Sequence, residues 1–402
     1  MRFNARTAGL AALMSLAPGM RARADEPGER AEALLFGTAV NRFVGKQMPV
    51  TLQLRGVRAA GIAPLDVTLT EARYCGAVDA AHGRLLGVLR SGDATSAGPP
   101  ALAGARDCQD KLEDVARRLP PGLDASAVVE LVAQWVPWEL RFSIGDVATS
   151  GGDGAAALNA ALVRAKAAGP LTTVDTAGVH LQTGRGASLD LDLAVSFVKA
   201  RDALLVTLSP ADASGGGREL RPSFLDPPAA PAGTDAIIGA LFPLANRVVA
   251  LFTQDGPLVL ELEGQAVEVR ALQISGGNGL LTVRGRATPR ALQETVRLAI
   301  EASGADLKIS EVRAEAELED CAAASALAAL TCRARNAARA AAVAAIASSM
   351  TAHYRGQLLR VLLAPPPFSF EIGGRHLTLT LTPSRARSTA AGLIVYGGTD
   401  LN

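Results

Sequence analysis

The chain has 402 residues, of which 40 are Lys or Arg and 39 are Asp or Glu. This length exceeds what one hydrophobic core usually supports, so two domains are expected. The balanced charge argues against a nucleic-acid-binding protein, which would carry a basic excess. Aromatic residues make up only 4% of the chain, and this disfavours a surface that stacks sugars or bases.

The first residues have the pattern of a secretory signal peptide. Arginines precede a short apolar stretch over 7–20, and the small-x-small triplet at 22–24 fits a cleavage site. The alternative, a membrane anchor, is disfavoured because a span needs about 20 apolar residues and Pro18 interrupts this stretch. We therefore expect residues 1–24 to be a signal peptide and the protein to be periplasmic or secreted.

Short sequence matches recur in the same order in the two halves of the chain. Collinear matches of this kind predict a tandem duplication. Between the halves, a stretch rich in Pro, Gly and Ser predicts a linker over 209–233, so the expected repeats are 25–208 and 234–402. The matched pairs are 35–44 with 241–249, 49–56 with 257–264, 85–88 with 280–283, 139–143 with 306–310, and 189–193 with 377–381.

Each repeat is expected to begin with an amphipathic helix and to continue with strands. The helices are predicted over 27–46 and 234–254. Residues 50–54 and 258–262 then alternate aliphatic and polar side chains, which is typical of antiparallel sheet with one buried face. In the second repeat, the run Gly-Gly-Asn-Gly over 276–279 predicts a hairpin turn.

A second helix is expected next in each repeat, around 129–131 and over 288–304. In the second repeat, Thr288 suits an N-cap, Pro289 suits the first helical position and Gly304 suits the end of a helix. The strands cluster rather than alternate singly with helices, which favours an α+β fold of two tandem repeats of a curved antiparallel sheet wrapped on long amphipathic helices. The remaining expected elements are a strand over 139–147 and 306–316, a longer helix over 154–168 and 333–363, and three closing strands.

The chain contains four cysteines, and an even number in an exported protein favours disulfides. The simplest scheme pairs Cys75 with Cys108 and Cys321 with Cys332. A continuous helix from Cys321 to Cys332 would hold them roughly 16 Å apart, whereas a disulfide needs Cα atoms within about 7 Å. Either a turn breaks that helix near 328–331 or these two do not pair. Buried thiols are the alternative, and metal ligation is disfavoured because no His lies at ligand spacing.

No catalytic or nucleotide-binding motif is recognisable, neither a nucleophile elbow nor a zinc-protease helix nor a phosphate-binding glycine loop. Asp190 and Asp192 lie two apart on a predicted strand, and paired carboxylates can perform acid–base chemistry; solvent-facing strand positions account for them more simply. We expect no enzyme, no metal site and no cofactor. The histidines are scattered and have no acidic partner or second His at helical spacing: His82, His180, His353 and His376.

Two features are open to more than one interpretation. Trp135 and Trp138 are the only tryptophans and could face a ligand, face a membrane or pack at a domain edge. The apolar residues are dominated by Ala, Leu and Val. A cavity lined by such aliphatic side chains would suit an acyl chain, and a filled core would have the same composition.

Taken together, these elements resemble the tubular lipid-binding superfamily, the group of bactericidal permeability-increasing protein and lipid-transfer proteins. The resemblance lies in the helix-to-strand passages 35–56 and 241–264, the long helix 333–363 and final strands such as 376–382. It implies an elongated protein of two domains, each a helix wrapped by a curved sheet around an apolar groove that binds lipid non-covalently. No catalytic residues come with it.

We therefore expect an exported cell-envelope protein that binds or transfers lipid in apolar grooves. The alternative is a structural or scaffolding envelope protein with a filled core, and an unrecognised enzyme is the third reading. The expected partners are a lipid or other apolar small molecule, with transient membrane contact and no nucleic acid. The larger apolar residues expected to line the grooves are Phe36, Phe43, Phe142, Phe242, Phe252, Met350, Phe368 and Phe370.

Overall fold

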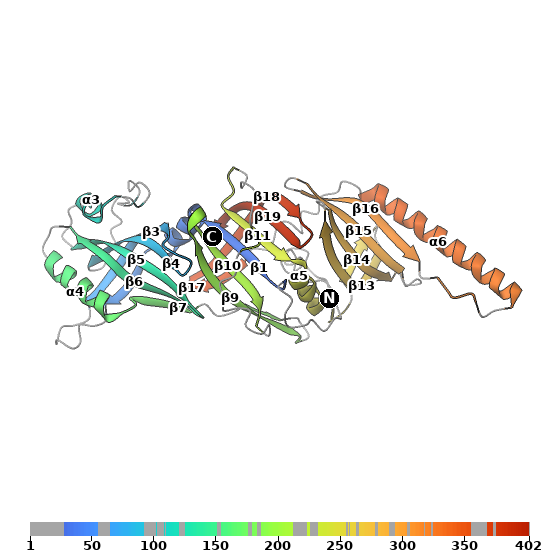
Figure 1. The fold of residues 1–402 in the computed structure, drawn as a ribbon, viewed down its shortest axis with the longest axis horizontal. Coiled ribbons are helices and arrows are strands. Elements are labelled where there is room, and N and C mark those ends of the chain that lie inside the picture. Colours follow the sequence, from blue (N-terminus) through green and yellow to red (C-terminus); the bar gives the residue numbers. More distant parts are fainter. Residues whose placement is uncertain are drawn as a thin grey trace.

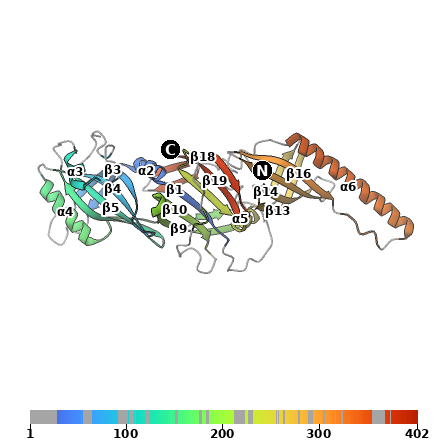
Figure 2. The ribbon, with the colours of Figure 1, turned by 45° about the horizontal axis from the view of Figure 1, so that its top comes forward.

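The protein is an α+β chain of three antiparallel sheets arranged along one axis (Figures 1 and 2). In both views a central sheet lies between two end sheets, and the molecule is elongated. The predicted signal peptide lies outside the described part of the chain. The computed structural model describes residues 28–54, 65–91, 102, 108, 110–119, 125–150, 154–175, 179–182, 186–211, 223–225, 232–254, 256, 258–262, 265–277, 280–288, 294–303, 306–316, 318–322, 325–354, 368–372 and 375–401.

The central sheet is built from both halves of the chain. Its strand order is β17-β18-β19-β11-β1-β10-β9-β8, so four strands from the second half are followed by four from the first. The bounds are Phe368–Ile372 for β17, Arg375–Ser388 for β18, Gly392–Leu401 for β19, Ala236–Leu241 for β11, Ala31–Phe36 for β1, Ala203–Pro210 for β10, Ser188–Val198 for β9 and Val179–Gln182 for β8.

Each end sheet comes from one half of the chain. The first end sheet has the order β2-β3-β4-β5-β6-β7 and the second has the order β12-β13-β14-β15-β16. The first consists of Val50–Leu54, Leu65–Ala77, His82–Ser91, Ser126–Val136, Glu139–Thr149 and Thr172–Asp175. The second consists of Leu258–Leu262, Gln265–Gly277, Leu280–Thr288, Glu294–Ser303 and Asp306–Ala316.

The helices are fewer and mostly shorter than expected. Within the described ranges they are α2 (Gly37–Gln47), α3 (Leu112–Arg117), α4 (Ala155–Ala168), α5 (Phe242–Gln254) and α6 (Ala326–Tyr354), and a 3₁₀ turn, η3, lies at Lys199–Arg201. Only α6 is long, with 29 residues. We expected sheets wrapped on long amphipathic helices. The helices that lie between the sheets, α2 and α5, are instead short, with 11 and 13 residues.

The order of elements occurs twice along the chain. In both halves a strand and a short helix are followed by a run of hairpin strands, a further helix and closing strands. The first half differs by α3, between β4 and β5, and by one more closing strand. The sequence matches fall on corresponding elements: 50–54 is β2 and 258–262 is β12, while 139–143 begins β6 and 306–310 begins β16. The Gly-rich run over 276–279 does join two antiparallel strands, β13 and β14.

Strands replace part or all of four expected helices. The segments 27–46 and 234–254 begin with β1 and β11 and continue as the helices α2 and α5, whereas the predicted helices around 129–131 and over 288–304 are β5 and, for the most part, β15. The physical reason is pairing on both sides: β1 lies between β10 and β11, β5 between β4 and β6, and β15 between β14 and β16. Two neighbours satisfy the backbone groups of such strands, and this outweighs a weak helical preference.

Both predicted disulfides are present. Cys75 on β3 pairs with Cys108 at a Cα separation of 5.5 Å, and Cys321 pairs with Cys332 at 5.8 Å. The turn that allows the second pairing is not near 328–331, where α6 is continuous. Cys321 lies before α6, which begins at Ala326, so the chain reverses ahead of the helix. Two disulfides are consistent with an exported protein.

Polar contacts between the halves are reciprocal. Arg42 on α2 donates to the carboxylate of Asp235, just before β11, and to the backbone carbonyl of Thr399. Arg247 on α5 donates to Glu29, just before β1, at 2.7 Å. Each half thus supplies an arginine from its first helix to an acidic residue that precedes the first strand of the other half.

Candidate functional site: the apolar junction

One face of the central sheet is aliphatic across its middle strands. Antiparallel pairing places Ala33 opposite Val206 on one side and opposite Ile238 on the other. The row continues to Val195 on β9 and to Val395 on β19. Directly opposed residues share a face of the sheet. The two outer residues are buried, whereas Ala33, Val206 and Ile238 are only half-buried.

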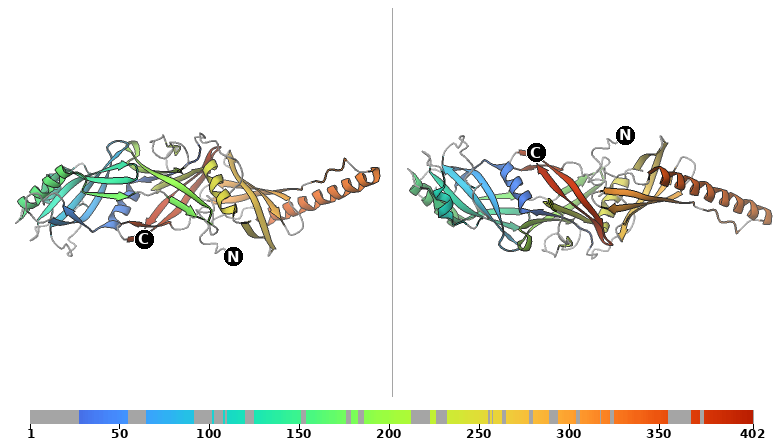
Figure 3. Two further views of the ribbon diagram at one scale, coloured as in Figure 1. Left: turned by 90° about the horizontal axis from the view of Figure 1, so that it is seen from below. Right: turned by 90° about the horizontal axis from the view of Figure 1, so that it is seen from above.

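Two short helices lie at the ends of this face. Figure 3 shows α2 and α5 at the two junctions between the central sheet and the end sheets. On α5, Leu244 and Val248 are fully buried and pack with Ala31 of β1 and Leu191 of β9. Val40 of α2 is buried at the other junction. The central sheet and the two helices thus share one apolar layer.

A large buried group lies where the first end sheet meets the central sheet, and we call it the junction cluster. Its members come from β2–β6 and α4, from α2 and from β9. Half-buried apolar side chains surround it, among them Leu140 and Phe142 of the first end sheet and Leu193 and Leu204 of the central sheet. Its buried members include Val40, Leu69, Tyr74, Leu131, Trp135, Leu162, Val195 and Phe197.

Two aromatic side chains bring polar atoms into this apolar cluster. Tyr74 is 5% exposed and Trp135 is 6% exposed. The phenol oxygen of Tyr74 and the indole Nε1 of Trp135 are buried, and neither has a hydrogen-bond partner among the residues that the structure describes. Burial, with a smaller contribution from the charge of Asp202, raises the pKa of Tyr74 to about 12. Both groups are therefore hydrogen-bond donors at neutral pH.

The position of Tyr74 is fixed from two sides. Its backbone N–H donates to the Asn41 side-chain oxygen at 2.6 Å, which ties β3 to α2. Its ring stacks on Phe197 with the centroids 6.5 Å apart. The Phe197 ring lies over Gly83 on β4, and a Cβ at Gly83 would overlap that ring. A glycine is needed there because an aromatic side chain of the central sheet occupies the space.

The eight residues predicted to line grooves are not brought together in one place. Phe142 packs against the junction cluster, whereas Phe36 packs against a separate cluster on the opposite face of the central sheet. Phe242 is buried at the start of α5 and Phe43 is half-buried on α2. Phe252 lies on α5, Met350 on α6, and Phe368 and Phe370 on β17, and their side chains lie outside the described part of the structure.

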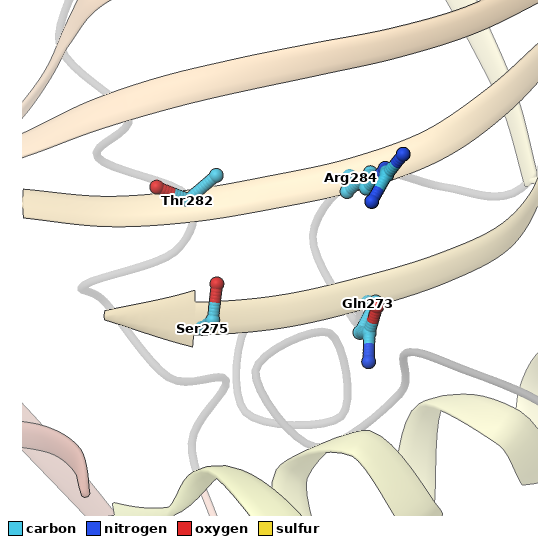
Figure 4. Close-up of a pocket in the computed structure, with 4 residues that line it drawn as sticks. All are labelled: Gln273, Ser275, Thr282 and Arg284. Carbon is cyan, nitrogen blue, oxygen red and sulfur yellow. The ribbon is translucent and has the colours of Figure 1, made fainter. Parts of the chain in front are cut away.

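The second end sheet carries a polar depression instead of an apolar one. It has a volume of about 350 Å³ and is lined by Gln273, Ser275, Thr282 and Arg284. These residues form two cross-strand pairs, Gln273 with Arg284 and Ser275 with Thr282, and Figure 4 shows them along the two neighbouring strands. The alternate residues Leu272 and Ile274 are buried. This depression does not have the lining that an acyl chain needs.

Two histidines have acidic neighbours that the sequence reading missed. Nδ1 of His82 lies 2.9 Å from Asp79, three residues earlier, and Nδ1 of His180 lies 2.5 Å from Asp190. The hydrogen bond from His82 lowers the pKa of the Asp79 carboxyl. Both pairs are exposed to solvent. In the described ranges, no group of three or more His, Cys, Asp or Glu is placed to hold a metal ion.

The residues that sequence reasoning missed are Tyr74 and Phe197. The available signal was only that each is a large aromatic residue on a predicted or alternating strand segment. Of the two tryptophans, Trp135 lies near the end of β5, and Trp138 follows in the turn to β6 with a positive φ of 73° and 38% exposure. Among the described helices, none is long and apolar enough to cross a membrane.

Comparisons with known proteins give only distant structural similarity. No protein-family model and no curated protein sequence matches the chain. The solved structures similar to it include P47 of Clostridium botulinum E1 (6% identity, 93% of this chain and 99% of that chain covered, TM-score 0.34) and P47 of Clostridium botulinum A2 (7%, 92% and 97%, 0.34). A lipopolysaccharide binding protein is also similar (8%, 93% and 99%, 0.26). Similarity at this level establishes neither a family nor a ligand for this chain.

Proposed function

We propose that the protein is a non-catalytic, exported protein of the cell envelope that binds or transfers a lipid at the junction cluster. The proposal includes a signal peptide over 1–24, repeats over 25–208 and 234–402 joined by a linker over 209–233, and membership of the tubular lipid-binding superfamily. An elongated molecule with short helices between curved sheets and an aliphatic sheet face supports it.

The observation that carries the proposal is the pair of unpartnered donors within the junction cluster. An unpaired buried donor costs roughly 1–3 kcal/mol, and two in one apolar group call for an explanation. A ligand that is mostly hydrocarbon but carries acceptor oxygens would remove that cost. A fatty acid, or the ester carbonyls of a glycerolipid, has this chemistry.

The remaining affinity would come from the hydrocarbon part of the ligand. Each buried CH₂ contributes about 0.8 kcal/mol. An acyl chain of ordinary length can therefore bind even when the protein covers only part of its surface. The half-buried aliphatic residues Ala33, Val206 and Ile238 form a surface on which such a chain can lie. The half-buried Phe142 and Leu140 are placed at the edge of the cluster.

Native mass spectrometry of the mature protein, with lipid extraction of the same sample, tests the proposal. We expect a stoichiometric acyl species. The variant Tyr74→Phe removes one donor without changing the packing; it should fold at least as stably as the wild type and retain less ligand. Tyr396→Phe is the matched control, because Tyr396 is buried on the other face of the central sheet.

Two results would contradict the proposal. A clean apo mass, with no uptake of added fatty acid or phospholipid, would favour a scaffold with a filled core. Equal ligand content in the Tyr74→Phe and Tyr396→Phe variants would show that the Tyr74 hydroxyl is a packing imperfection rather than a ligand partner.

A further inference from the structure

The long helix α6 extends beyond the second end sheet. Figure 1 shows it projecting from the end of the molecule, and Figure 3 shows the same projection from two further sides. Only its later half is held by buried contacts, through Val343 and Ala347. Its first half therefore forms the outermost part of this end of the protein.

This projecting half is held rigidly by the segment that precedes it. The disulfide between Cys321 and Cys332 joins that segment to α6. Asn336 accepts a hydrogen bond from the backbone N–H of Glu319 at 3.1 Å and donates to its carbonyl at 2.8 Å. The side of α6 that carries Cys332 and Asn336 is thus covered, and the opposite side is presented to solvent.

The solvent-facing side of this half is apolar, and we call it the outer face. By the 3.6-residue period, its members lie on one side of the helix, opposite Cys332 and Asn336. Leu327 is 80% exposed and Leu330 is 69% exposed. Two neighbouring leucines this exposed are unusual on a surface with no partner. The outer face consists of Leu327, Leu330, Ala334, Ala337, Ala338 and Ala341, all exposed.

The charges on α6 are all positive. The helix from Ala326 to Tyr354 contains no Asp or Glu. Helical spacing places Arg333 at one edge of the outer face and Arg335 at the other. Glu319, in the preceding segment, lies 3.5 Å from Arg335. The outer face is therefore an apolar surface bordered by arginines.

We propose that the outer face of α6 docks the protein on an anionic phospholipid surface. An apolar stripe bordered by arginines is the arrangement of helices that lie in the plane of a membrane interface. The leucines would enter the acyl boundary while the arginines meet lipid phosphates. A second copy of the chain fits less well, because pairing this face with the same face of another α6 would also bring the bordering arginines of the two copies together.

Vesicle binding tests the proposal directly. The full-length mature protein would be measured by flotation with vesicles of phosphatidylcholine, with and without phosphatidylglycerol. We expect binding to the vesicles that contain phosphatidylglycerol, and a loss of at least about tenfold in the double variant Leu327→Ser/Leu330→Ser. Arg333→Glu should reduce the preference for phosphatidylglycerol. Val163→Ser is the control, because Val163 is 55% exposed on α4 at the other end of the molecule.

The outcomes separate this proposal from ligand binding at the junction cluster. Unchanged vesicle binding in the double leucine variant would overturn it. So would a change from dimer to monomer in that variant without a change in vesicle binding, since this would identify a second copy as the partner. Vesicle binding that depends on the leucines, in a protein that carries no lipid, would support the docking surface while contradicting the proposed function.

Discussion

Ala33 and Ile238 face each other across the pairing of β1 with β11, and they occupy the same position in the two halves of the chain. The register pairs Ala31 with Ala240 and Leu35 with Ala236 on either side of them. An offset of 205 residues maps β1 onto β11 and exchanges these two outer pairs. The centre of the molecule is therefore a pseudo-twofold axis, and each half completes the apolar face of the other.

The two first helices are attached to their end sheets by equivalent asparagines. Asn246 accepts from the Ile274 backbone N–H at 2.7 Å and donates to the Ile274 carbonyl at 2.9 Å. Asn41 makes the same pair with Tyr74, with a longer donor bond of 3.4 Å. These residues come from the matched passages 35–44 and 241–249.

We predict that Asn246→Ala destabilises the protein by about 1–3 kcal/mol, because it leaves two buried backbone groups of Ile274 unpaired. Asn41→Ala should cost less, since its second bond is longer. Urea denaturation of both variants measures the difference. The Asn246→Asp variant keeps the acceptor oxygen but loses the N–H donor, so it should be less stable than the wild type. A urea midpoint equal to that of the wild type would show that the amide N–H does not stabilise the contact with Ile274.

The contact between the halves through Asp235 should be a second sensitive point. Asp235 is 6% exposed and accepts from the backbone N–H of Thr399 at 2.6 Å and from its hydroxyl at 3.2 Å, in addition to Arg42. We predict that Arg42→Ala costs about 1–3 kcal/mol, because it removes a hydrogen-bond donor from a buried carboxylate. Arg117→Ala is the control and should stay within about 0.5 kcal/mol, since Arg117 is 77% exposed in its pair with Asp114. Equal effects of the two variants would contradict the assignment.

The sequence predicts several strands and the disulfides better than it predicts the helices. Matches such as 50–54 with 258–262 identify equivalent strands because alternation is preserved wherever one sheet face is buried. The segment Glu294–Ser303 was nevertheless expected as a helix, because Thr288, Pro289 and Gly304 resemble helix boundaries. The alternation of Val296, Leu298 and Ile300 is a strand signal, and the pairing of β15 with β14 and β16 decides between the two.

The sequence predicted the apolar character of the candidate site but not the residues that form it. Aliphatic composition indicated an apolar surface, but the meeting of Tyr74, Trp135 and Phe197 depends on contacts between β3, β5 and β9, which lie far apart in the chain. Large side chains alone were a poor guide. Phe36 and Phe142 were both expected to line a groove, but they pack against different clusters. Phe142 lies on the first end sheet and packs against the junction cluster, whereas Phe36 lies on the central sheet and points to the opposite face.

Gly83 gives a test of the junction cluster that does not alter a polar group. We predict that Gly83→Ala displaces the Phe197 ring, lowers stability by about 1–3 kcal/mol and reduces ligand retention. Gly45→Ala is the matched control: a Cβ there meets nothing within 4 Å, and the position lies inside α2, so alanine should stabilise by about 0.5–1 kcal/mol. Unchanged ligand retention in Gly83→Ala would place the ligand away from Phe197.

Glu32 should make stability depend on pH. It is 2% exposed on β1, accepts from the Ser223 hydroxyl at 2.6 Å and from the Phe224 N–H at 3.1 Å, and lies 3.4 Å from Arg30. Burial raises the pKa of the Glu32 carboxyl despite these contacts. The folded state therefore binds this proton more tightly than the unfolded state, so stability falls as pH rises from about 4.5 through the folded-state pKa.

We predict that Glu32→Gln removes this fall, because the amide carries no charge to desolvate and its oxygen can still accept from Ser223 and Phe224. The measurement is the difference in urea midpoint between wild type and variant at several pH values from 4 to 7. The variant should gain relative to the wild type as pH rises. A difference that stays constant with pH would show that Glu32 has the same pKa in both states.

The two disulfides should differ in their effect on stability. Cys75–Cys108 holds the segment with α3 against a buried cluster on the first end sheet, which includes Val115 and Val128, so Cys75→Ser/Cys108→Ser should lower stability by about 2–4 kcal/mol.

Cys321–Cys332 closes a shorter loop at an exposed tip, so Cys321→Ser/Cys332→Ser should leave the global urea midpoint nearly unchanged. Its effect should be local, with faster amide hydrogen exchange in the first half of α6 and weaker binding to vesicles that contain phosphatidylglycerol, because a flexible tip must be ordered on docking. Equal losses of global stability in the two double variants would mean that the tip is part of the cooperative core rather than an appendage stabilised by its own disulfide.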